Sequence, residues 1–452
     1  MPIDCAFSGC SGLTSITIGN GIKSMGYQSF WDTTLLTNIY ITDVAVWCYI
    51  DGLDNLMGWC QKKLYLNNEL ITDLVIPDGV TSIGNSAFRY YSILTSIIIP
   101  NSVTSIGNAA FYDCSLTSVN IPDSVTSIGN SAFENCDKLT SVTIGNGVTS
   151  IGERVFCDCS LTSINIPDSV TSIGYYAFGY CRKLTYNEYD NGLYLGNENN
   201  PYLFLMNTKS NDITSCIINE NCKVIYYYAF GYCSSLTSIT IPDRVTSIEY
   251  YAFDGCSSLT SVTIGDGVAS ISDYAFAGCI GLKSITVLPD NSKYHSDGNC
   301  LIETESKKLI SGCKKSIIPT DGSVTSIGNG AFIGLSSLTS ITIPNSVNNI
   351  GNYAFSGCSG LTNIVIPDSV TSIGESAFTD CSGLTNIVIP DSVTSIGPYT
   401  FTGCSVIKEI HYEGTKEQWS YLSKGIGDWF IWNNGKTITV YFSDGTTTTI
   451  TT

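Results

Sequence analysis

The chain has 452 residues, of which 43% are hydrophobic and 13% are charged, so it can build a sizeable core and is not a disordered chain by composition. Its 39 acidic and 21 basic residues give a net charge of -18, which disfavours binding to nucleic acid or to an anionic membrane surface. No apolar run approaches the roughly 18 residues that span a bilayer, so membrane insertion is not expected.

A repeat of 22 or 23 residues runs along the chain from its first residues. Each copy places a phenylalanine at the same phase, and 14 of the 17 phenylalanines belong to this series. The marker residues are Phe7, Phe30, Phe88, Phe111, Phe133, Phe156, Phe178, Phe230, Phe253, Phe276, Phe332, Phe355, Phe378 and Phe401. Such a repeat predicts a solenoid, which grows along one axis and does not need several separate cores.

One unit, residues 355–377 with the sequence FSGCSGLTNIVIPDSVTSIGESA, shows the expected parts. Residues 361–366 follow the L-x-x-L-x-L pattern of a leucine-rich-repeat strand. Pro367 lacks the N–H that a sheet needs, and Asp368 favours a turn, so the strand ends there. Residues 369–374 predict a second short extended piece, and the residues around the next phenylalanine predict a helical or 3₁₀ turn.

These units resemble the BspA-like leucine-rich repeats, also called the TpLRR class, over nearly the whole chain. The resemblance implies a mainly β solenoid of stacked 22–23-residue coils with parallel strands and short helical or 3₁₀ turns. We expect this leucine-rich-repeat solenoid to cover residues 1–404 and a capping segment to cover residues 405–452. Members of the class are mostly bacterial or protozoan surface proteins associated with adhesion, which implies an extracellular or cell-surface location.

The first residues, MPIDCAFSGCSGL, already match the middle of a repeat and carry no secretory signal. We expect that these 452 residues are a piece of a longer secreted protein, because a solenoid normally begins with a cap. A cytoplasmic protein and a misplaced start are the alternatives.

Eleven of the 19 cysteines stand three residues after a marker phenylalanine. Leu335 occupies the same position after Phe332, so the position accepts an aliphatic side chain and the cysteines are expected in the core. Some disulfides or a metal site are the alternatives, although a straight ladder suits neither geometry. The predicted core includes Phe88, Phe111, Phe133, Phe253, Phe355, Phe378, Cys114, Cys136, Cys256, Cys358 and Cys381.

Three interruptions break the series, near residues 31–78, 182–226 and 287–320. Each contains a pattern that predicts a β-hairpin, at residues 62–77, 191–206 and 299–313. Insertions in repeat proteins often map to a binding face. In the first interruption, Trp47 and Trp59 either seal a widened coil or form an exposed contact site. In the third, Cys300 and Cys313 flank the predicted hairpin and are the pair best placed for a disulfide.

A concentration of tyrosines lies near the middle of the series, just before or two residues after a marker phenylalanine. Stacked coils would gather these rings into one patch, which is either a contact surface or an aromatic ladder packed on the back face. The candidate ligand-binding residues are Tyr175, Tyr176, Tyr180, Tyr227, Tyr228, Tyr232, Tyr250, Tyr251 and Tyr274, together with Trp47 and Trp59.

The outward positions of the strands carry small polar side chains, with one column nearly all serine. This flat face lacks the aromatic and arginine anchors that dominate interface energies. At the C-terminus, residues 415–425 predict a short helix and residues 437–451 a hairpin, with Trp419, Trp429 and Trp432 covering the last coil.

No catalytic, cofactor-binding or metal-binding motif is assembled. The two histidines, His295 and His411, lie far apart in the coil order, and one aspartate per coil falls short of the ligands that calcium takes. We therefore expect a monomeric, non-catalytic binding or adhesion module without a cofactor. Its partner would be a protein or glycoprotein on a host or microbial surface, and not nucleic acid. The alternative is a passive spacer that projects another domain.

Overall fold

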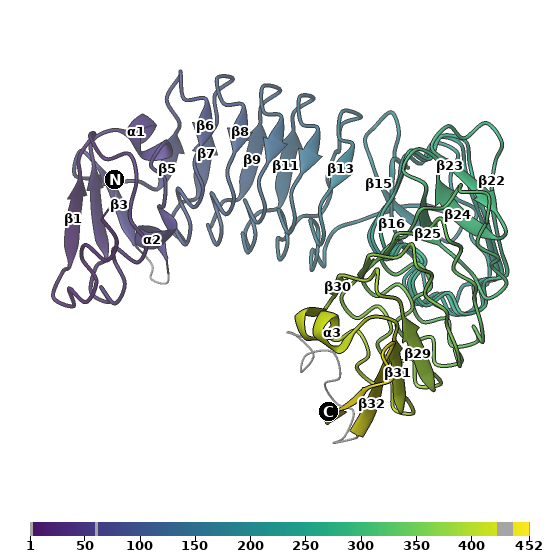
Figure 1. Ribbon diagram of the computed structural model, residues 1–452. Helices are drawn as coiled ribbons and strands as arrows, with labels where there is room; N and C mark the ends of the chain where they lie inside the picture. The colour runs from purple at the N-terminus through teal and green to yellow at the C-terminus, as the bar shows by residue number, and fades with distance from the viewer. Residues whose placement is uncertain (1–2, 59–61, 423–436, 452) are drawn as a thin grey trace. The chain divides into compact units, whose positions relative to one another are not determined.

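The computed structural model describes residues 3–58, 62–422 and 437–451. Contacts between Cα atoms divide the chain into two compact units. The first comprises residues 1–187 and 195–201, and the second comprises residues 188–194 and 202–452. Both units are built from stacked coils with two parallel strands per coil and little helix (Figure 1). The predicted boundary at residues 404/405 stays a prediction, since the contacts divide the chain elsewhere.

In the first unit, parallel strands from successive coils pair in register, so that Ser141 lies opposite Ser118 and Ile144 opposite Ile121. The longer strands are β1 (Ser15–Ile18), β2 (Asn38–Ile41), β3 (Lys63–Leu66), β5 (Asp73–Val75), β7 (Ser96–Ile98), β9 (Ser118–Ile121) and β11 (Ser141–Ile144), and the two-residue β4 (Glu69–Leu70) pairs antiparallel with β3. The shorter strands form one five-stranded sheet of β6 (Ser82–Ile83), β8 (Ser105–Ile106), β10 (Ser127–Ile128), β12 (Ser150–Ile151) and β13 (Ser172–Ile173). Two short helices, α1 (Val44–Cys48) and α2 (Asp54–Met57), lie in the first interruption.

The second unit repeats the arrangement with four sheets. One six-stranded sheet contains β14 (Asn187–Tyr189), β15 (Gly192–Leu195), β16 (Phe204–Thr208), β17 (Val224–Ile225), β19 (Ser247–Ile248) and β21 (Ser270–Ile271). A parallel three-stranded sheet contains β18 (Ser238–Ile241), β20 (Ser261–Ile264) and β22 (Ser284–Val287). A seven-stranded sheet contains β23 (Tyr294–Asp297), β24 (Cys300–Glu303), β25 (Lys308–Ser311), β26 (Ser326–Ile327), β27 (Asn349–Ile350), β28 (Ser372–Ile373) and β30 (Ser395–Ile396). The last sheet contains β29 (Asn386–Ile389), β31 (Glu409–Tyr412), β32 (Thr437–Phe442) and β33 (Thr447–Thr451), and α3 (Lys416–Leu422) follows β31.

Strand residues alternate between core and surface, as the L-x-x-L-x-L pattern predicts. In β9 the side chains of Val119 and Ile121 are buried while Ser118 and Asn120 are exposed. Pro122 follows at once and ends the strand, because it cannot donate to the next coil. The register therefore puts the main apolar rows on the inside of the coil, although Val75, Ile98 and Val365 lie exposed on the outer face.

The segment around each marker phenylalanine, here called the phenylalanine turn, is neither helical nor 3₁₀, contrary to the sequence prediction. In the Phe88 coil, Ser86 and Tyr90 have φ angles of 56° and 58°, in the left-handed region. The positions two residues before and two after the phenylalanine, called slots −2 and +2, are left-handed in nearly every coil. Each left-handed residue other than glycine costs about 1–2 kcal/mol in conformational energy. The cost is offset by hydrogen bonds between coils, because alternation of right- and left-handed residues turns every second N–H toward the next coil.

Phenylalanine rings stack through the core of each unit. The Phe88 and Phe111 ring centroids are 5.4 Å apart with planes 5° from parallel, and Phe253 and Phe276 are 5.2 Å apart at 7°. Phe88, Phe111, Phe133, Phe253, Phe355 and Phe378 are fully buried. The spacing is close to one strand repeat, so stacking follows directly from in-register coils.

The cysteines three residues after the phenylalanine do more than fill space. The Sγ of Cys256 donates to the carbonyl oxygen of Phe230 in the preceding coil, at 3.1 Å. The same contact, between 3.0 and 3.2 Å, is made by Cys114, Cys136, Cys159, Cys181, Cys279, Cys358, Cys381 and Cys404. Leu335 occupies this position where the preceding coil is an interruption and offers no phenylalanine carbonyl. The thiol is therefore a buried hydrogen-bond donor as well as a small apolar group.

All cysteines of the described residues are free, including Cys300 and Cys313. The predicted pairing of these two is wrong in this structure. Leu301 lies opposite Ser311, and a bulge shifts the register after that pair, so the two cysteines do not face each other as a bonded pair. Burial raises the pKa of the Cys300 thiol to about 12, which keeps it protonated.

The interruptions contain antiparallel strands. β3 pairs with β4 across Asn67 and Asn68, which both have positive φ angles, as a tight hairpin turn requires. In the second interruption, β14, β15 and β16 are neighbours in one sheet. In the third, β23, β24 and β25 form an antiparallel meander, one strand more than the predicted hairpin.

At the C-terminal end, the predicted helix is α3, and the predicted hairpin is the antiparallel pair of β32 and β33. Trp419 on α3 is buried, with its ring 5.2 Å from Tyr412 and 6.1 Å from Phe442. Trp429 and Trp432 lie outside the described residues.

Candidate binding surface

A ladder of tyrosine rings occupies slot −2 of three successive coils in the second unit. The centroids of Tyr228 and Tyr251 are 5.2 Å apart at 9°, and those of Tyr251 and Tyr274 are 5.3 Å apart at 10°. Tyr353 continues the row, with an edge-on contact of 6.2 Å to Tyr274. We call Tyr228, Tyr251, Tyr274 and Tyr353 the tyrosine ladder. The left-handed backbone at slot −2 repeats in each coil, and this repetition brings the rings into register.

Other tyrosines extend the ladder toward solvent. Tyr227 lies edge-on against Tyr228 at 4.4 Å, and Tyr232 in slot +2 of the same coil stacks on Tyr228 at 5.9 Å. Tyr232 is 60% exposed and Tyr250 is 49% exposed. The ladder rings themselves are half-buried. The surface therefore has a fixed, packed base and two accessible rings beside it.

Electrostatics keep these phenols neutral. Burial, with a smaller contribution from Asp254, raises the pKa of Tyr228 to about 12. Burial likewise raises the pKa of Tyr251 and Tyr274. The pKa of Asp254 is raised by burial and opposed by a hydrogen bond from Tyr232. At neutral pH the ladder therefore offers hydroxyl donors and acceptors on an apolar base.

The first unit carries a smaller group of the predicted tyrosines. Tyr175 and Tyr176 are in edge contact at 4.0 Å, and Tyr176 stacks on Tyr180 at 5.9 Å. Tyr175 and Tyr180 are exposed. The structure thus brings the predicted tyrosines together within each unit.

The two predicted tryptophans have different outcomes. Trp47 is 1% exposed, and its indole N–H donates to the carbonyl of Ala87 at 2.8 Å. The idea that it forms an exposed contact site is therefore wrong, because the ring is used to seal the widened coil. Trp59 lies outside the described residues.

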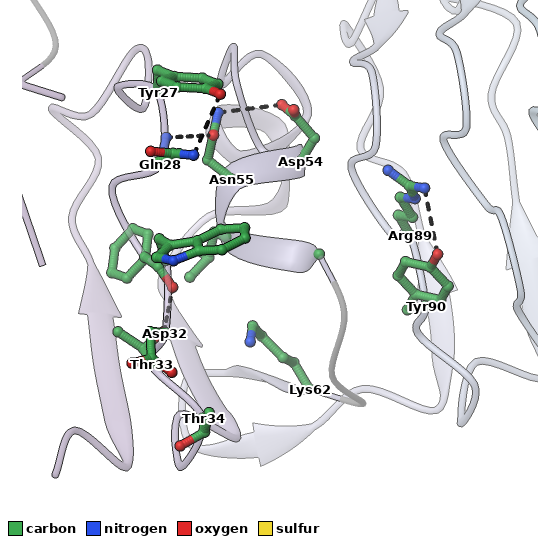
Figure 2. A pocket seen from close by; sticks show the side chains of 14 residues that line it. Tyr27, Gln28, Asp32, Thr33, Thr34, Asp54, Asn55, Lys62, Arg89 and Tyr90 are labelled. Carbon is green, nitrogen blue, oxygen red and sulfur yellow. Dashed lines mark hydrogen bonds between the residues drawn. The ribbon is translucent and has the colours of Figure 1, made fainter. Parts of the chain in front are cut away.

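Sequence reasoning missed a pocket in the first interruption. Its volume is about 610 Å³, and it is lined by the turn of Phe30, by α2, and by Lys62, Arg89 and Tyr90 (Figure 2). Trp31 is 57% exposed and lines one wall. The only signal in the sequence was the interruption itself, since these residues lie far apart in the chain.

The described residues hold no group of three or more His, Cys, Asp and Glu side chains that could bind a metal ion. Nδ1 of His295 contacts the Thr304 hydroxyl at 3.0 Å, and Nε2 of His411 contacts Glu409 at 3.2 Å. Both are local contacts between residues that lie close together in the chain. None of the helices in the described ranges is long and apolar enough to cross a bilayer.

Comparison with known proteins agrees with this architecture. The profile of the BspA type leucine rich repeat region matches residues 3–47, 61–185, 206–321 and 306–423. A leucine rich cell surface protein from Faecalibacterium prausnitzii is 30% identical, covering 78% of this chain and 90% of its own, with a TM-score of 0.40. A leucine-rich repeat protein from Bacteroides ovatus is 24% identical over 97% of this chain and 86% of its own, with a TM-score of 0.32. The leucine rich repeat protein of T. pallidum is 15% identical over 74% of this chain and 78% of its own, with a TM-score of 0.15. A search of curated proteins returned no match.

The chain belongs to the BspA-type leucine-rich repeat family, which confirms the resemblance drawn from its 23-residue units. Its fold is a mainly β solenoid of leucine-rich coils. A similar protein of this family is a bacterial cell-surface protein.

Proposed function

We propose that the chain is a non-catalytic protein-binding or adhesion module of a microbial surface or secreted protein, and that the tyrosine ladder is its main contact surface. The stacked rings of Tyr228, Tyr251 and Tyr274 are the observation that carries the proposal. The family and the cell-surface relative support an extracellular location. The partner we propose is a protein or glycoprotein on a host or microbial surface.

The tyrosine ladder can bind a partner at a small cost in side-chain conformational entropy. A tyrosine gives a large contact area and a hydroxyl group, and rings that are already stacked lose little freedom on binding. Tyr232 and Tyr250 are exposed beside this base, where a partner could bury them. The outward strand faces carry mainly Ser, Thr and Asn, which rarely anchor an interface. The ladder is therefore the better candidate for specific contact.

The experiment is a binding measurement with purified matrix proteins and with microbial surface extracts immobilised in parallel. The test variant changes Tyr232, Tyr250 and Tyr251 to serine. Tyr399→Ser is the matched control, because Tyr399 occupies slot −2 and is 42% exposed but has no ring partner in the described part of the chain. We expect the test variant to lose at least about tenfold in affinity, and the control to keep it.

Equal binding by wild type and test variant would overturn the role of the ladder. No specific binding by any version would favour the alternative function, a passive spacer. Circular dichroism of all versions shows whether a loss of binding reflects a loss of fold.

A further inference from the structure

Hydrogen bonds between phenylalanine turns follow a fixed rule in the regular coils. The N–H groups of slot −2, of the phenylalanine and of slot +2 donate to carbonyls of the next coil. In the Phe88 coil, Ser86 N–H donates to Asn108, Phe88 N–H to Ala110 and Tyr90 N–H to Tyr112, at 2.8, 2.8 and 2.7 Å. Each turn thus donates hydrogen bonds to the next coil and accepts them from the preceding coil. We call one such hydrogen-bonded turn a rung.

The first interruption removes one rung. Side chains replace two of its bonds: Asn55 Oδ1 accepts from Gln28 N–H at 2.9 Å, and Trp47 donates to the carbonyl of Ala87. The N–H groups of Phe30 and Asp32 have no acceptor among the described residues. Across the gap, the carbonyl of Arg89 receives no donor from them either. Unpaired donors therefore face one wall of the pocket and an unpaired acceptor faces the other.

The side chain of Arg89 is also incompletely paired. Its guanidinium lies 4.9 Å from the ring centroid of Tyr90, and one terminal nitrogen contacts the Tyr90 hydroxyl at 3.4 Å. Its Nε is buried and has no partner in the described part of the chain. Figure 2 shows Arg89 and Tyr90 on the opposite wall from Asp32, with Lys62 between them. The guanidinium also lies 5.2 Å from the ring centroid of Tyr112. Because Nε is covered, a ligand in the pocket would meet the terminal nitrogens of this half-buried side chain, which lines the wall.

The third interruption shows that a missing rung does not by itself leave a pocket. There the two flanking turns contact each other directly, since Gly278 N–H donates to the carbonyl of Ile333 at 3.3 Å. A Cβ on Gly334 would lie 3.2 Å from the Cα of Gly278. Glycine occupies slot +2 in both turns. At the first interruption the same slots hold the larger residues Asp32 and Tyr90, which line the pocket.

We propose that this pocket binds a segment of polypeptide from a partner protein, which supplies the missing rung. Carbonyls of the segment accept from the N–H groups of Phe30 and Asp32, and one of its N–H groups donates to the carbonyl of Arg89. A carboxylate side chain of the segment pairs with the terminal nitrogens of the Arg89 guanidinium. This inference rests on the proposed protein-binding function but assigns it a second site, in the first unit.

A polypeptide fits the pocket better than a sugar does. The unpaired groups are backbone donors and a backbone acceptor spaced as in a rung, which is the pattern that another backbone provides. The pocket lining carries two basic residues, Lys62 and Arg89, and two acidic residues, Asp32 and Asp54, so its net charge is near zero. We therefore place the single carboxylate of the segment beside Arg89.

The test begins with a display library of random dodecapeptides, panned against the whole chain and followed by calorimetric titration of the enriched peptides. Arg89→Met removes the guanidinium but keeps the unbranched apolar stem of the side chain. Arg244→Met is its control, because Arg244 is an exposed arginine that bonds Asn221 in the second unit. Asp32→Gly combined with Tyr90→Gly reproduces the closed interruption, and glycine suits both left-handed positions.

We expect peptides with an acidic residue to bind the wild type, to bind Arg89→Met at least about tenfold more weakly, and not to bind the two-glycine variant. Replacing the peptide N–H that faces Arg89 by an ester oxygen weakens binding, whereas the same change at a solvent-facing position does not. Failure to enrich any peptide, or equal binding to all variants, would overturn the proposal. So would binding of neutral oligosaccharides alone, lost on Trp31→Ala. Because the ladder variants lie in the second unit, failure here leaves the ladder proposal standing.

Discussion

Two regular runs of coils, one in each unit, have the same interior and different surfaces. In the first three coils of the run that begins at Phe88, slot −2 is small and the residue after the phenylalanine, slot +1, is large. Their pairs are Ser86 with Arg89, Ala109 with Tyr112 and Ser131 with Glu134, whereas the last two coils of this run have the reverse order, Arg154 with Cys157 and Tyr176 with Gly179. In the run that begins at Phe230 the sizes are reversed, and the pairs are Tyr228 with Gly231, Tyr251 with Asp254 and Tyr274 with Ala277.

The reversal has a steric cause. A Cβ added at Gly231 would lie 2.6 Å from the ring of Tyr228, and one added at Gly179 would lie 2.6 Å from the ring of Tyr176. The ring in slot −2 therefore lies over slot +1 of its own coil, and only one of the two slots can hold a large side chain freely. Buried phenylalanines and cysteines recur in both runs. Slots −2 and +1 can therefore hold different side chains, and so form different surfaces, on the same backbone.

The largest effect we expect is on pH dependence, since both runs share the buried thiols. Burial raises the pKa of Cys136 in the first unit and of Cys381 in the second from about 9 to about 12. In the unfolded chain these thiols ionise near pH 9, whereas in the folded chain they stay protonated. Stability is therefore unaffected by them below pH 9 and falls between pH 9 and 12, by about 1.4 kcal/mol per pH unit for each thiol.

Urea unfolding at pH 7.5, 8.5, 9.5 and 10.5 measures this slope. Cys136→Val removes one ionising group and should lower the slope by about one proton. A stability that stays constant to pH 10.5 would contradict the buried, protonated state of the thiols.

The next effect compares the phenylalanine stacks. Phe133→Ala in the first unit and Phe253→Ala in the second each remove a fully buried ring between two stacked neighbours. We expect each to lower the free energy of unfolding by about 3–5 kcal/mol. Urea unfolding followed by far-ultraviolet circular dichroism measures the loss, with Tyr232→Ala as an exposed control. A small loss of unfolding free energy in one run alone would show that the phenylalanine stacks of the two runs are not equivalent.

A smaller effect tests the thiol as a donor. Cys256→Val keeps an apolar side chain but removes one of the two donors to the carbonyl of Phe230, which still accepts from the N–H of Cys233. We expect a loss of about 0.5–1.5 kcal/mol in the free energy of unfolding. A Cys256→Val variant as stable as the wild type in thermal and urea unfolding would show that the thiol serves only to fill space.

The smallest effect concerns the strand faces. Ser118 points outward from β9, so Ser118→Lys should change stability by no more than about 0.5 kcal/mol. The melting temperature checks this, and Val119→Lys at the neighbouring buried position is the control that should unfold the coil. A large loss for Ser118→Lys would mean that this face is in contact with something.

Most of the features that recur in every coil could be predicted from the sequence. The phenylalanine spacing predicted the coil, and the alternation in residues such as 361–366 predicted which strand residues face inward. The left-handed turn was predictable only at slot +2, where six of the 14 turns have glycine and five have Asp or Asn, the residue types that most readily adopt positive φ. At slot −2 serine, alanine, tyrosine and other residue types give no such signal. The thiol bonds were missed because cysteine and leucine at one position suggest packing alone.

The candidate site was predictable only in part. The tyrosines at slots −2 and +2 were visible as a cluster, since coils in register bring equal positions together. The pocket was not, because its lining residues lie far apart in the chain and depend on how the interruption folds. For Trp47 the sequence left two interpretations open, and the structure confirms the seal of the widened coil and not the contact site.

The most direct test of the account is a double-mutant cycle in the first unit, on Ala109 in slot −2 and Tyr112 in slot +1. Ala109→Tyr alone should cost about 1–3 kcal/mol, because the new ring meets Tyr112. With Tyr112→Ala also present, the pair becomes the arrangement of the second unit. We predict that this double variant loses at least about 1 kcal/mol less than the sum of the single losses. Losses that add within about 0.5 kcal/mol would contradict the claim that one frame carries two exchangeable surfaces.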